Sequence, residues 1–210
     1  MSGTGQELEV KFYLNHPARL QSRLEALGAH LEQPRTHEIN LRFDTPALDL
    51  LHSGRLLRLR QDTAARITYK GPGRVEGGAR LRQELEFVAS DFAMAQAVIE
   101  ALGYQVVMMY EKQRATYALG EVLVTLDEMP YGSFAEIEGP DGERIQQAAA
   151  QLGLDWQQRI LESYTVLFDQ VKQTLGFTFR DLSFENFAGL EIPPAALGVE
   201  AADNTEKSSL

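Results

Sequence analysis

The sequence contains no cysteine, which excludes disulfide bonds, thiolate nucleophiles and zinc sites of the zinc-finger type. It has no apolar run long enough to span a membrane, and its start shows no basic segment followed by an apolar one. Its histidines, His16, His30, His37 and His52, lack the spacing of a metal site, so we expect them at the surface or at helix ends. These absences favour a cytoplasmic protein without a membrane helix or a signal peptide.

Positive charge is also scarce. The 210 residues include 20 Lys and Arg against 30 Asp and Glu, for a formal net charge of −10. This excess opposes long-range attraction to nucleic acid or to an anionic membrane, so we expect neither as a partner. A local basic cluster is still compatible with that average. A hydrophobic fraction of 44% and this length are enough for one domain with a substantial core.

Two kinds of periodicity divide the chain into strands and helices. Period-two alternation and β-branched or aromatic residues predict strands at 6–13, 37–43, 55–61, 66–70, 80–87, 105–117, 121–127 and 133–139. Helical patterns occupy about 16–28, 90–103, 141–153 and 161–175, with Ser90 as the expected N-cap of the second helix. The glycine-rich segment 71–78 lacks the P-loop ending, and we expect a flexible hairpin loop there. We expect 176–192 to pack back on the domain and 198–210 to form a flexible tail.

Most predicted strands carry charged residues on one face and apolar residues on the other. The segment QELEVKFYL shows the pattern, with Glu7, Glu9 and Lys11 on one side and Leu8 and Val10 on the other. The charged positions of the other strands are Arg58, Arg60, Lys70, Arg80, Arg82, Glu84, Glu86, Lys112, Arg114, Asp127, Glu136 and Glu138. A water-facing sheet would explain each strand alone, although its polar face usually mixes Thr, Ser, Gln and Lys.

The helices carry apolar stripes that must be buried, and this favours a different arrangement. If the helices cover the apolar faces of the strands, the charged faces point the other way. We therefore expect an α+β fold: an eight-stranded antiparallel closed β-barrel with a polar lumen and helices packed outside. Charges inside such a lumen must pair, bind a metal or meet a ligand of opposite charge. The cations suit several phosphates, and the carboxylates suit Mg²⁺ or Mn²⁺.

Over about residues 6–170 the chain resembles the CYTH superfamily, the triphosphate tunnel metalloenzymes. The motifs are, in order, ELEVK (the Glu-x-Glu-x-Lys signature), RLR, TYKGP, RQELEF, EKQR and LDEMPYGSFAEIEG. The resemblance implies an eight-stranded antiparallel barrel that forms a tunnel, here within a CYTH domain at 1–175 followed by a C-terminal extension at 176–210. The superfamily includes class IV adenylate cyclases, thiamine triphosphatases and inorganic triphosphatases.

Carried over by position, the resemblance assigns a role to most charged residues. Substrate phosphates would be bound by Lys11, Arg58, Arg60, Lys70, Arg82, Lys112 and Arg114. The metal, Mg²⁺ or Mn²⁺, would be bound by Glu7, Glu9, Asp127, Glu136 and Glu138. Glu9 and Lys11 would act most directly in catalysis, while Glu84 and Glu86 would brace the cations. Two segments depart from the pattern: THEINLRFDT matches the cyclase branch only loosely, and 161–192 lacks a clear lysine-bearing closing helix, with Lys172 as the nearest candidate.

Three functions are compatible with these residues. The first is a metal-dependent hydrolase of a triphosphate-bearing small molecule, such as ATP, tripolyphosphate or thiamine triphosphate. The second is a class IV-type adenylate cyclase, which would convert ATP to cyclic AMP and pyrophosphate. The third is a non-catalytic module that binds triphosphate or polyphosphate, which the fold alone does not exclude. The complete set of carboxylates argues against the third, and a homodimer is left open.

Overall fold

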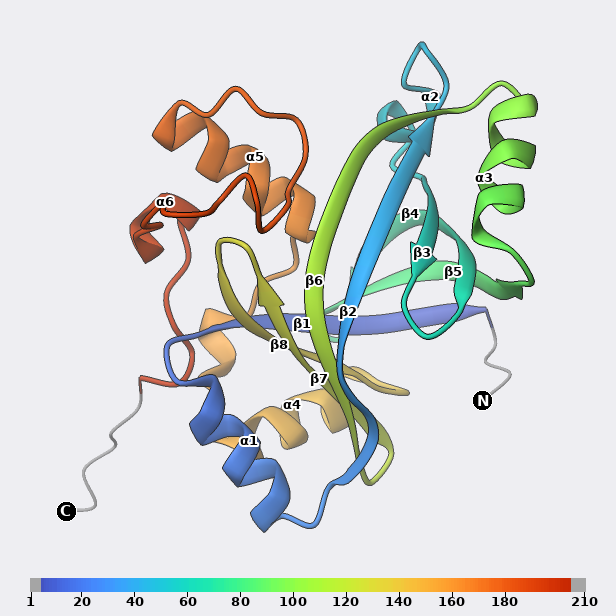
Figure 1. The fold of residues 1–210 in the computed structure, drawn as a ribbon. Helices are drawn as coiled ribbons and strands as arrows, with labels where there is room; N and C mark the ends of the chain where they lie inside the picture. Colours follow the sequence, from blue (N-terminus) through green and yellow to red (C-terminus); the bar gives the residue numbers. More distant parts are fainter. Residues whose placement is uncertain (1–4, 205–210) are drawn as a thin grey trace, which may run out of the picture.

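The computed structural model describes residues 5–204, whose strands close into an antiparallel barrel (Figure 1). The strands are β1 (Gln6–Leu14), β2 (His30–Asp44), β3 (Leu56–Gln61), β4 (Ala65–Glu76), β5 (Ala79–Ala89), β6 (Gln105–Leu119), β7 (Val122–Met129) and β8 (Gly132–Glu138). Their order around the barrel is β1-β5-β4-β3-β2-β6-β7-β8, and β8 pairs with β1 to close the ring. The predicted fold class is therefore confirmed.

The strand register explains why the charged positions meet inside. In β1, Glu7 lies opposite Arg82 of β5, and Lys11 lies opposite Glu136 of β8. Residues directly opposite each other in a ladder point to the same face of the sheet. A register shift by one residue would therefore place a whole row of charged side chains in the apolar layer outside the barrel. The alternation of charged and apolar residues thus fixes the register.

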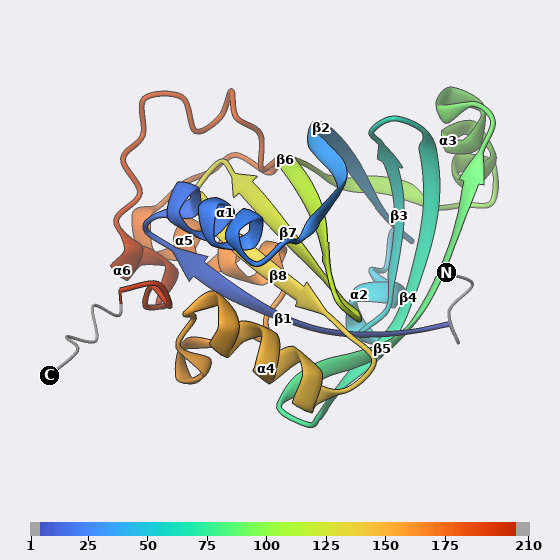
Figure 2. The same cartoon turned by 90° about the horizontal axis from the view of Figure 1, so that it is seen from below.

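Helices cover the outer face of the barrel (Figure 2). They are α1 (Pro17–Ala26), α2 (Asp49–His52), α3 (Phe92–Ala101), α4 (Gly142–Leu152), α5 (Tyr164–Leu175) and α6 (Pro194–Leu197), with a 3₁₀ turn at Trp156–Gln158. The helix α4 packs against β1, β7 and β8, and α1 packs beside it. Close approach at the start of α4 requires Gly142, because a Cβ there would collide with the carbonyl oxygen of Gly77.

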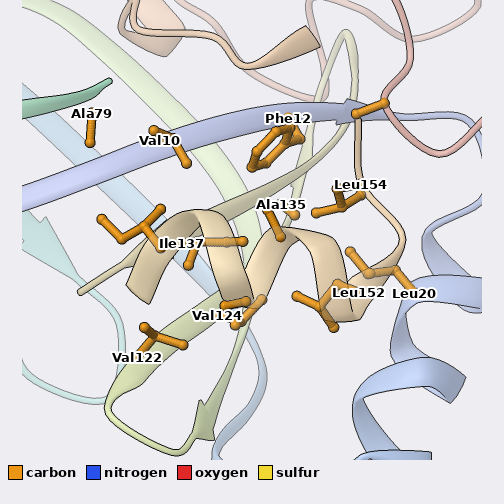
Figure 3. Packing of buried hydrophobic residues seen from close by; sticks show 14 of the residues in the cluster. Val10, Phe12, Leu20, Ala79, Val122, Val124, Ala135, Ile137, Leu152 and Leu154 are labelled. Atoms are coloured by element: carbon orange, nitrogen blue, oxygen red, sulfur yellow. The ribbon is translucent and has the colours of Figure 1, made fainter. Parts of the chain in front are cut away.

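The main apolar core lies between these helices and the barrel wall (Figure 3). Val10 and Phe12 of β1, Ile137 of β8 and Ile145 of α4 are at most 1% exposed. Burying each such side chain stabilises the fold by about 1.5–3 kcal/mol. The apolar half of each alternating strand thus holds the helices in place, while the other half is free to line the lumen.

A second apolar cluster joins the C-terminal extension to the barrel. It contains Leu167 and Phe168 of α5, together with Leu182 and Phe187 of the following segment. Leu182 is fully buried, and its backbone forms two hydrogen bonds with β6, to the Met109 carbonyl and from the Glu111 amide. The prediction that 176–192 packs back on the domain is confirmed.

Three local predictions were wrong. The segment 71–78 is not a loop, because β4 continues to Glu76 and only Gly77 and Gly78 turn into β5. A register irregularity between Lys70 and Gly73 absorbs the glycine-proline stretch, and the ladder with β5 then resumes. The N-cap of α3 is Asp91 rather than Ser90, since the Asp91 carboxylate accepts the Met94 amide at 2.6 Å.

The third error concerns the predicted flexible tail at 198–210. Ala201 and Ala202 are buried, and the Ala202 amide donates to the carbonyl oxygen of Tyr13 at 2.9 Å. The small side chains that suggested flexibility instead allow the backbone to lie close to β1. The part of this prediction at 205–210 lies outside the described residues.

The expectations for the histidines and for membrane helices can also be compared with the structure. All four histidines are exposed, although His30 and His37 lie within β2 rather than at a helix end. Within residues 5–204, no helix is both long and apolar enough to cross a membrane.

Asp203 ties the end of the described chain to the start of α1. Its carboxylate accepts the backbone amides of Asn15 at 2.9 Å and His16 at 2.6 Å, next to the first turn of α1. We expect Asp203→Ala to lower the free energy of unfolding by about 1 kcal/mol, as loss of a helix cap does. Urea denaturation measures this change. Glu200→Ala, at an exposed neighbouring position, is the matched control, and equal effects of the two substitutions would contradict the anchoring role.

Candidate active site

The inward-facing charged side chains surround a cavity of about 680 Å³. Residues predicted from the sequence to bind phosphate or metal and found in its wall are Glu7, Glu9, Lys11, Arg58, Arg60, Lys70, Arg82, Lys112, Arg114, Glu136 and Glu138. Glu84 and Glu86 line it as well. Six strands contribute to this set, so the barrel brings together residues that are far apart in the sequence.

Asp127 is the one predicted site residue that does not line the cavity. Its side chain is buried behind the cations, where it accepts hydrogen bonds from Arg114 at 2.6 Å, Tyr164 at 2.7 Å and Lys112 at 3.3 Å. Both carboxylate oxygens are used in these contacts. The arrangement suits a residue that holds cations in position better than one that binds a metal ion directly.

Along one side of the cavity, formed by β8, β1, β5 and β4, carboxylates alternate with two lysines. Lys11 is 2.6 Å from Glu9 and 3.3 Å from Glu136. Lys70 is 2.5 Å from Glu7 and 3.1 Å from Glu84. Each ammonium therefore lies between two carboxylates, and the whole group carries more negative charge than positive.

This crowding raises the pKa values of three carboxylates and of Lys11 alike. Burial, with the like charges of Glu136 and Glu84 nearby, raises the pKa of Glu9 and of Glu7 above the ordinary value of 4.5. Partial burial and the neighbouring carboxylates raise the pKa of Glu138, at the exposed rim, to about 7. Burial alone would lower the pKa of Lys11, but the adjacent carboxylates outweigh it and raise that pKa. A cation placed among these carboxylates would relieve their repulsion.

The other part of the cavity is dominated by cations. Arg58, Arg60, Lys112 and Arg114 all project from β3 and β6, and Lys112 is 2% exposed. Glu38 of β2 lies among them, 3.6 Å from Lys112 and 3.7 Å from Arg60. The surrounding cations outweigh the effect of burial and lower the pKa of Glu38 to about 2. One carboxylate thus stays ionised in a surrounding excess of positive charge.

Further groups orient the arginines. Arg58 donates to the hydroxyls of Tyr110 at 3.2 Å and Thr68 at 3.1 Å, and Thr68 in turn donates to Glu86 at 2.7 Å. Arg82 donates twice to the carbonyl oxygen of Gly71, at 3.1 and 2.8 Å. Hydrogen bonds of this kind fix a guanidinium before a ligand arrives, which reduces the entropy lost on binding.

Several buried polar atoms on the inner face have no hydrogen-bond partner within residues 5–204. They include both side-chain amide atoms of Asn40, the Nε atoms of Arg58 and Arg60, and Oγ1 of Thr125. Buried polar groups are normally hydrogen-bonded to protein or to ordered water. The lumen therefore has capacity for further polar contacts beyond those within the chain.

The carboxylates on this side of the cavity have the donor chemistry of a site for a hard divalent cation. Their oxygens are the ligands that suit Mg²⁺ or Mn²⁺. Within the described residues, however, no three acidic side chains already stand in an arrangement that could hold an ion. Glu7 and Glu9 point instead at Lys70 and Lys11. A metal site would form here only when these carboxylates leave their lysines.

Sequence reasoning missed Glu38, Tyr110 and Tyr164. Glu38 could have been found, because Glu38, Asn40 and Arg42 alternate with apolar neighbours as in the other strands. Tyr110 also shares the parity of Lys112, two residues along β6. No local signal identifies Tyr164, whose ring centroid lies 5.5 Å from the ammonium groups of both Lys11 and Lys112. Lys172, the candidate closing lysine, does not line the cavity and lies over the ring of Phe168.

Comparisons with solved structures agree with this architecture. A protein from Vibrio parahaemolyticus, provisionally named an adenylate cyclase, is 23% identical with a TM-score of 0.70, over 78% of this chain and 97% of its own. The PH1012 protein from Pyrococcus horikoshii OT3 is 28% identical with a TM-score of 0.64, over 75% and 96% of the two chains. A protein from Hippeastrum is 20% identical with a TM-score of 0.58, over 78% and 95%.

No curated protein sequence matches this chain. The model of one family, described as the CYTH domain, matches residues 5–166, which include all eight strands and every residue predicted to bind phosphate or metal. With this match and the closed barrel around a charged lumen, the chain belongs to the CYTH domain family.

Proposed function

We propose that this protein is a metal-dependent enzyme that hydrolyses a phosphoanhydride bond of a triphosphate-bearing small molecule inside the barrel. The observation that supports this most directly is the division of one cavity into a cationic part and a carboxylate-rich part. The cationic part matches the charge of linked phosphates, and the carboxylates match a divalent ion that accompanies them. ATP, tripolyphosphate and thiamine triphosphate all carry this polyanion.

The ion pairs among the lumen side chains suggest how the two ligands would bind together. Phosphate oxygens would draw Lys11 and Lys70 away from Glu9 and Glu7. The carboxylates released in this way, with Glu136 and Glu138, would hold Mg²⁺ or Mn²⁺. Each lysine would thus exchange a carboxylate for a phosphate, and each carboxylate would exchange its lysine for the metal. Neither charge is left unpaired in the lumen, which avoids the large cost of a buried lone ion.

The chain's own contribution to the reaction would be positioning and charge neutralisation. Phosphoryl transfer needs little covalent chemistry from the protein. Arg58, Arg60 and Arg114 can hold phosphate oxygens through paired N–H groups, and Lys112 acts as a point charge. The bound divalent ion would supply neutralisation of negative charge on the phosphates. Tyr110, whose hydroxyl accepts from Arg58 and has no acceptor of its own among the described residues, can donate one further hydrogen bond.

A second function has specific support. The relative from Vibrio parahaemolyticus is provisionally named an adenylate cyclase, and cyclisation of ATP would use the same cavity. The Hippeastrum protein, also provisionally named an adenylyl cyclase, is described as having a dominant triphosphatase activity. We therefore place hydrolysis first and cyclase activity second.

One assay separates hydrolysis, cyclisation and simple binding. The protein is incubated with Mg²⁺ or Mn²⁺ and ATP, tripolyphosphate or thiamine triphosphate, and phosphate, pyrophosphate and cyclic AMP are resolved. We expect phosphate release that a chelator stops, and its loss in Glu9→Gln, because that amide is a poorer metal ligand. Glu25→Gln, at an exposed position on α1, is the control. Cyclic AMP with pyrophosphate would favour the cyclase, whereas full activity of Glu9→Gln at limiting Mg²⁺ would contradict the assigned metal site.

Substitution of the lumen cations tests the phosphate site. We expect Arg58→Ala and Lys112→Ala each to weaken tripolyphosphate binding by roughly 2–5 kcal/mol, because each removes a desolvated cation. Titration calorimetry without divalent metal measures this loss. Arg74→Ala is the control, since Arg74 is exposed and pairs with Glu76 outside the cavity. Wild-type affinity in either lumen variant would remove that residue from the site.

Glu38 links stability to occupancy of the cavity. Because Glu38 offsets buried cations, we expect Glu38→Gln to lower the free energy of unfolding by roughly 3 kcal/mol in the absence of ligand. Its lowered pKa, about 2 against an ordinary 4.5, means that this contribution is fully present above pH 4.5 and is lost as the pH falls toward 2.

Thermal denaturation with and without tripolyphosphate measures the effect at pH 7. The ligand should stabilise Glu38→Gln more than the wild type, because phosphate supplies the missing negative charge. Equal stabilisation of both proteins would show that Glu38 does not neutralise the phosphate-binding cations.

A further inference from the structure

One end of the barrel is crossed by the segment 159–165, which links β8 and α4 to α5. The backbone of Ile160 pairs with Lys11 in both directions, with N–O distances of 3.1 and 2.8 Å. Before this point the Arg159 side chain donates to the carbonyl oxygen of Gly78, at the turn between β4 and β5. The side chain of Arg80 donates to the carbonyl oxygen of Leu161 at 3.3 Å.

The same segment is attached on the opposite side of the barrel. Arg42 of β2 donates to the hydroxyl of Thr165 at 2.7 Å. Between these two attachments, the hydroxyl of Tyr164 donates to Asp127 of β7, and Tyr131 donates to the carbonyl oxygen of Tyr164. Segment 159–165 therefore spans from the turn between β4 and β5, past β1 and β7, to β2, and its residues 163–165 form part of the cavity wall.

Apolar side chains fill the space behind this crossing segment. Tyr13 of β1, Phe134 of β8 and Met129 of β7 have the same parity as the lumen charges of their strands but belong to the second apolar cluster. The ring of Phe134 packs edge-on against that of Tyr164 at 5.2 Å. Leu182 and Leu197 of the C-terminal extension are fully buried in the same cluster. The helix α5 lies with α6 beside the barrel (Figure 1).

The opposite end of the cavity has no comparable cover among the described residues. Gln6, Leu85 and Glu138 line the cavity there and are exposed, and Leu85 is 52% exposed. The family match ends at residue 166, so most of α5 and the described part of the C-terminal extension, which pack behind the crossing segment, lie beyond it.

From these contacts we infer that the lumen is a blind pocket with a single entrance, at the end of Gln6, Leu85 and Glu138. One end of a polyphosphate chain enters the pocket and stops at the crossing segment and Tyr164. The chain does not pass through the barrel. The substrates this selects are molecules with a free terminal phosphate, bound end first. The inference rests on the proposed function, because it concerns how the same phosphate site is reached.

Binding stoichiometry tests this inference. A long linear polyphosphate of uniform length is mixed with excess protein without divalent metal, and the copies bound per chain are measured by sedimentation and native mass spectrometry. A blind pocket allows one copy at each end, so we expect two copies per chain at every length. The control is the same chain with both terminal phosphates blocked by a bulky amide. It reports association with the outer surface, which the net negative charge should keep low.

The outcomes separate this inference from the proposed function. Copies per chain that increase with chain length above the blocked-chain background would overturn the blind pocket, because only an open tunnel lets several copies thread one chain. Two copies at all lengths would support it. Absence of binding to tripolyphosphate itself would overturn the proposed function, and the blind polyphosphate pocket with it.

A kinetic measurement gives a second, independent readout. With Mg²⁺ present, a chain that enters end first must withdraw before its shortened form binds again. We therefore expect intermediate chain lengths to accumulate evenly while long chains are degraded. Complete degradation of some chains beside untouched ones would indicate threading and would contradict the single entrance.

Discussion

The structure depends on the pairing of charges inside a closed barrel. Arginines, lysines and glutamates line the cavity from seven strands, and each unpaired buried ion there would cost several kcal/mol. The apolar faces of the same strands pack against the helices outside. The charged faces must therefore point into the lumen. Lys11, Lys70, Lys112 and Arg114 each lie beside at least one carboxylate, and these pairs offset the cost of burying the charges.

These ion pairs are of two kinds. Some hold the cations in position, and others can exchange their partners for a ligand. Asp127 is buried away from the cavity and makes contacts with three partners, so it can hold Lys112 and Arg114 whether or not a ligand is present. Glu7 and Glu9 instead face the cavity beside one lysine each, and their pKa values are raised. A raised pKa means that the ionised carboxylate is disfavoured in its present surroundings. Such carboxylates gain the most from a new cation, and their lysines gain from a new anion.

The sequence predicted the barrel and most of its lumen because both follow from a local rule. Side chains alternate along a strand, so a charge at every second position defines an inner face before any long-range contact is known. The same rule could have added Glu38. It could not place Asp127 behind the cations, since parity gives the face of a sheet and not the depth. Composition was misleading at 71–78 and 198–204, where glycine, proline and alanine suggested mobility but backbone pairing and close packing fix the chain.

Tyr164 lies at the boundary between the charged lumen and the second apolar cluster, and no pattern in its own segment predicts that position. Its hydroxyl reaches the buried charge network through Asp127, while its ring packs on Phe134 in the apolar cluster. Along β1 the same inner face changes from Lys11 to Tyr13 within one side-chain repeat. A water-filled channel open at both ends would need polar residues along its whole length. The change to aromatic side chains at one end is therefore what a pocket closed at that end requires. The C-terminal extension supplies the apolar side chains that pack against these aromatic residues.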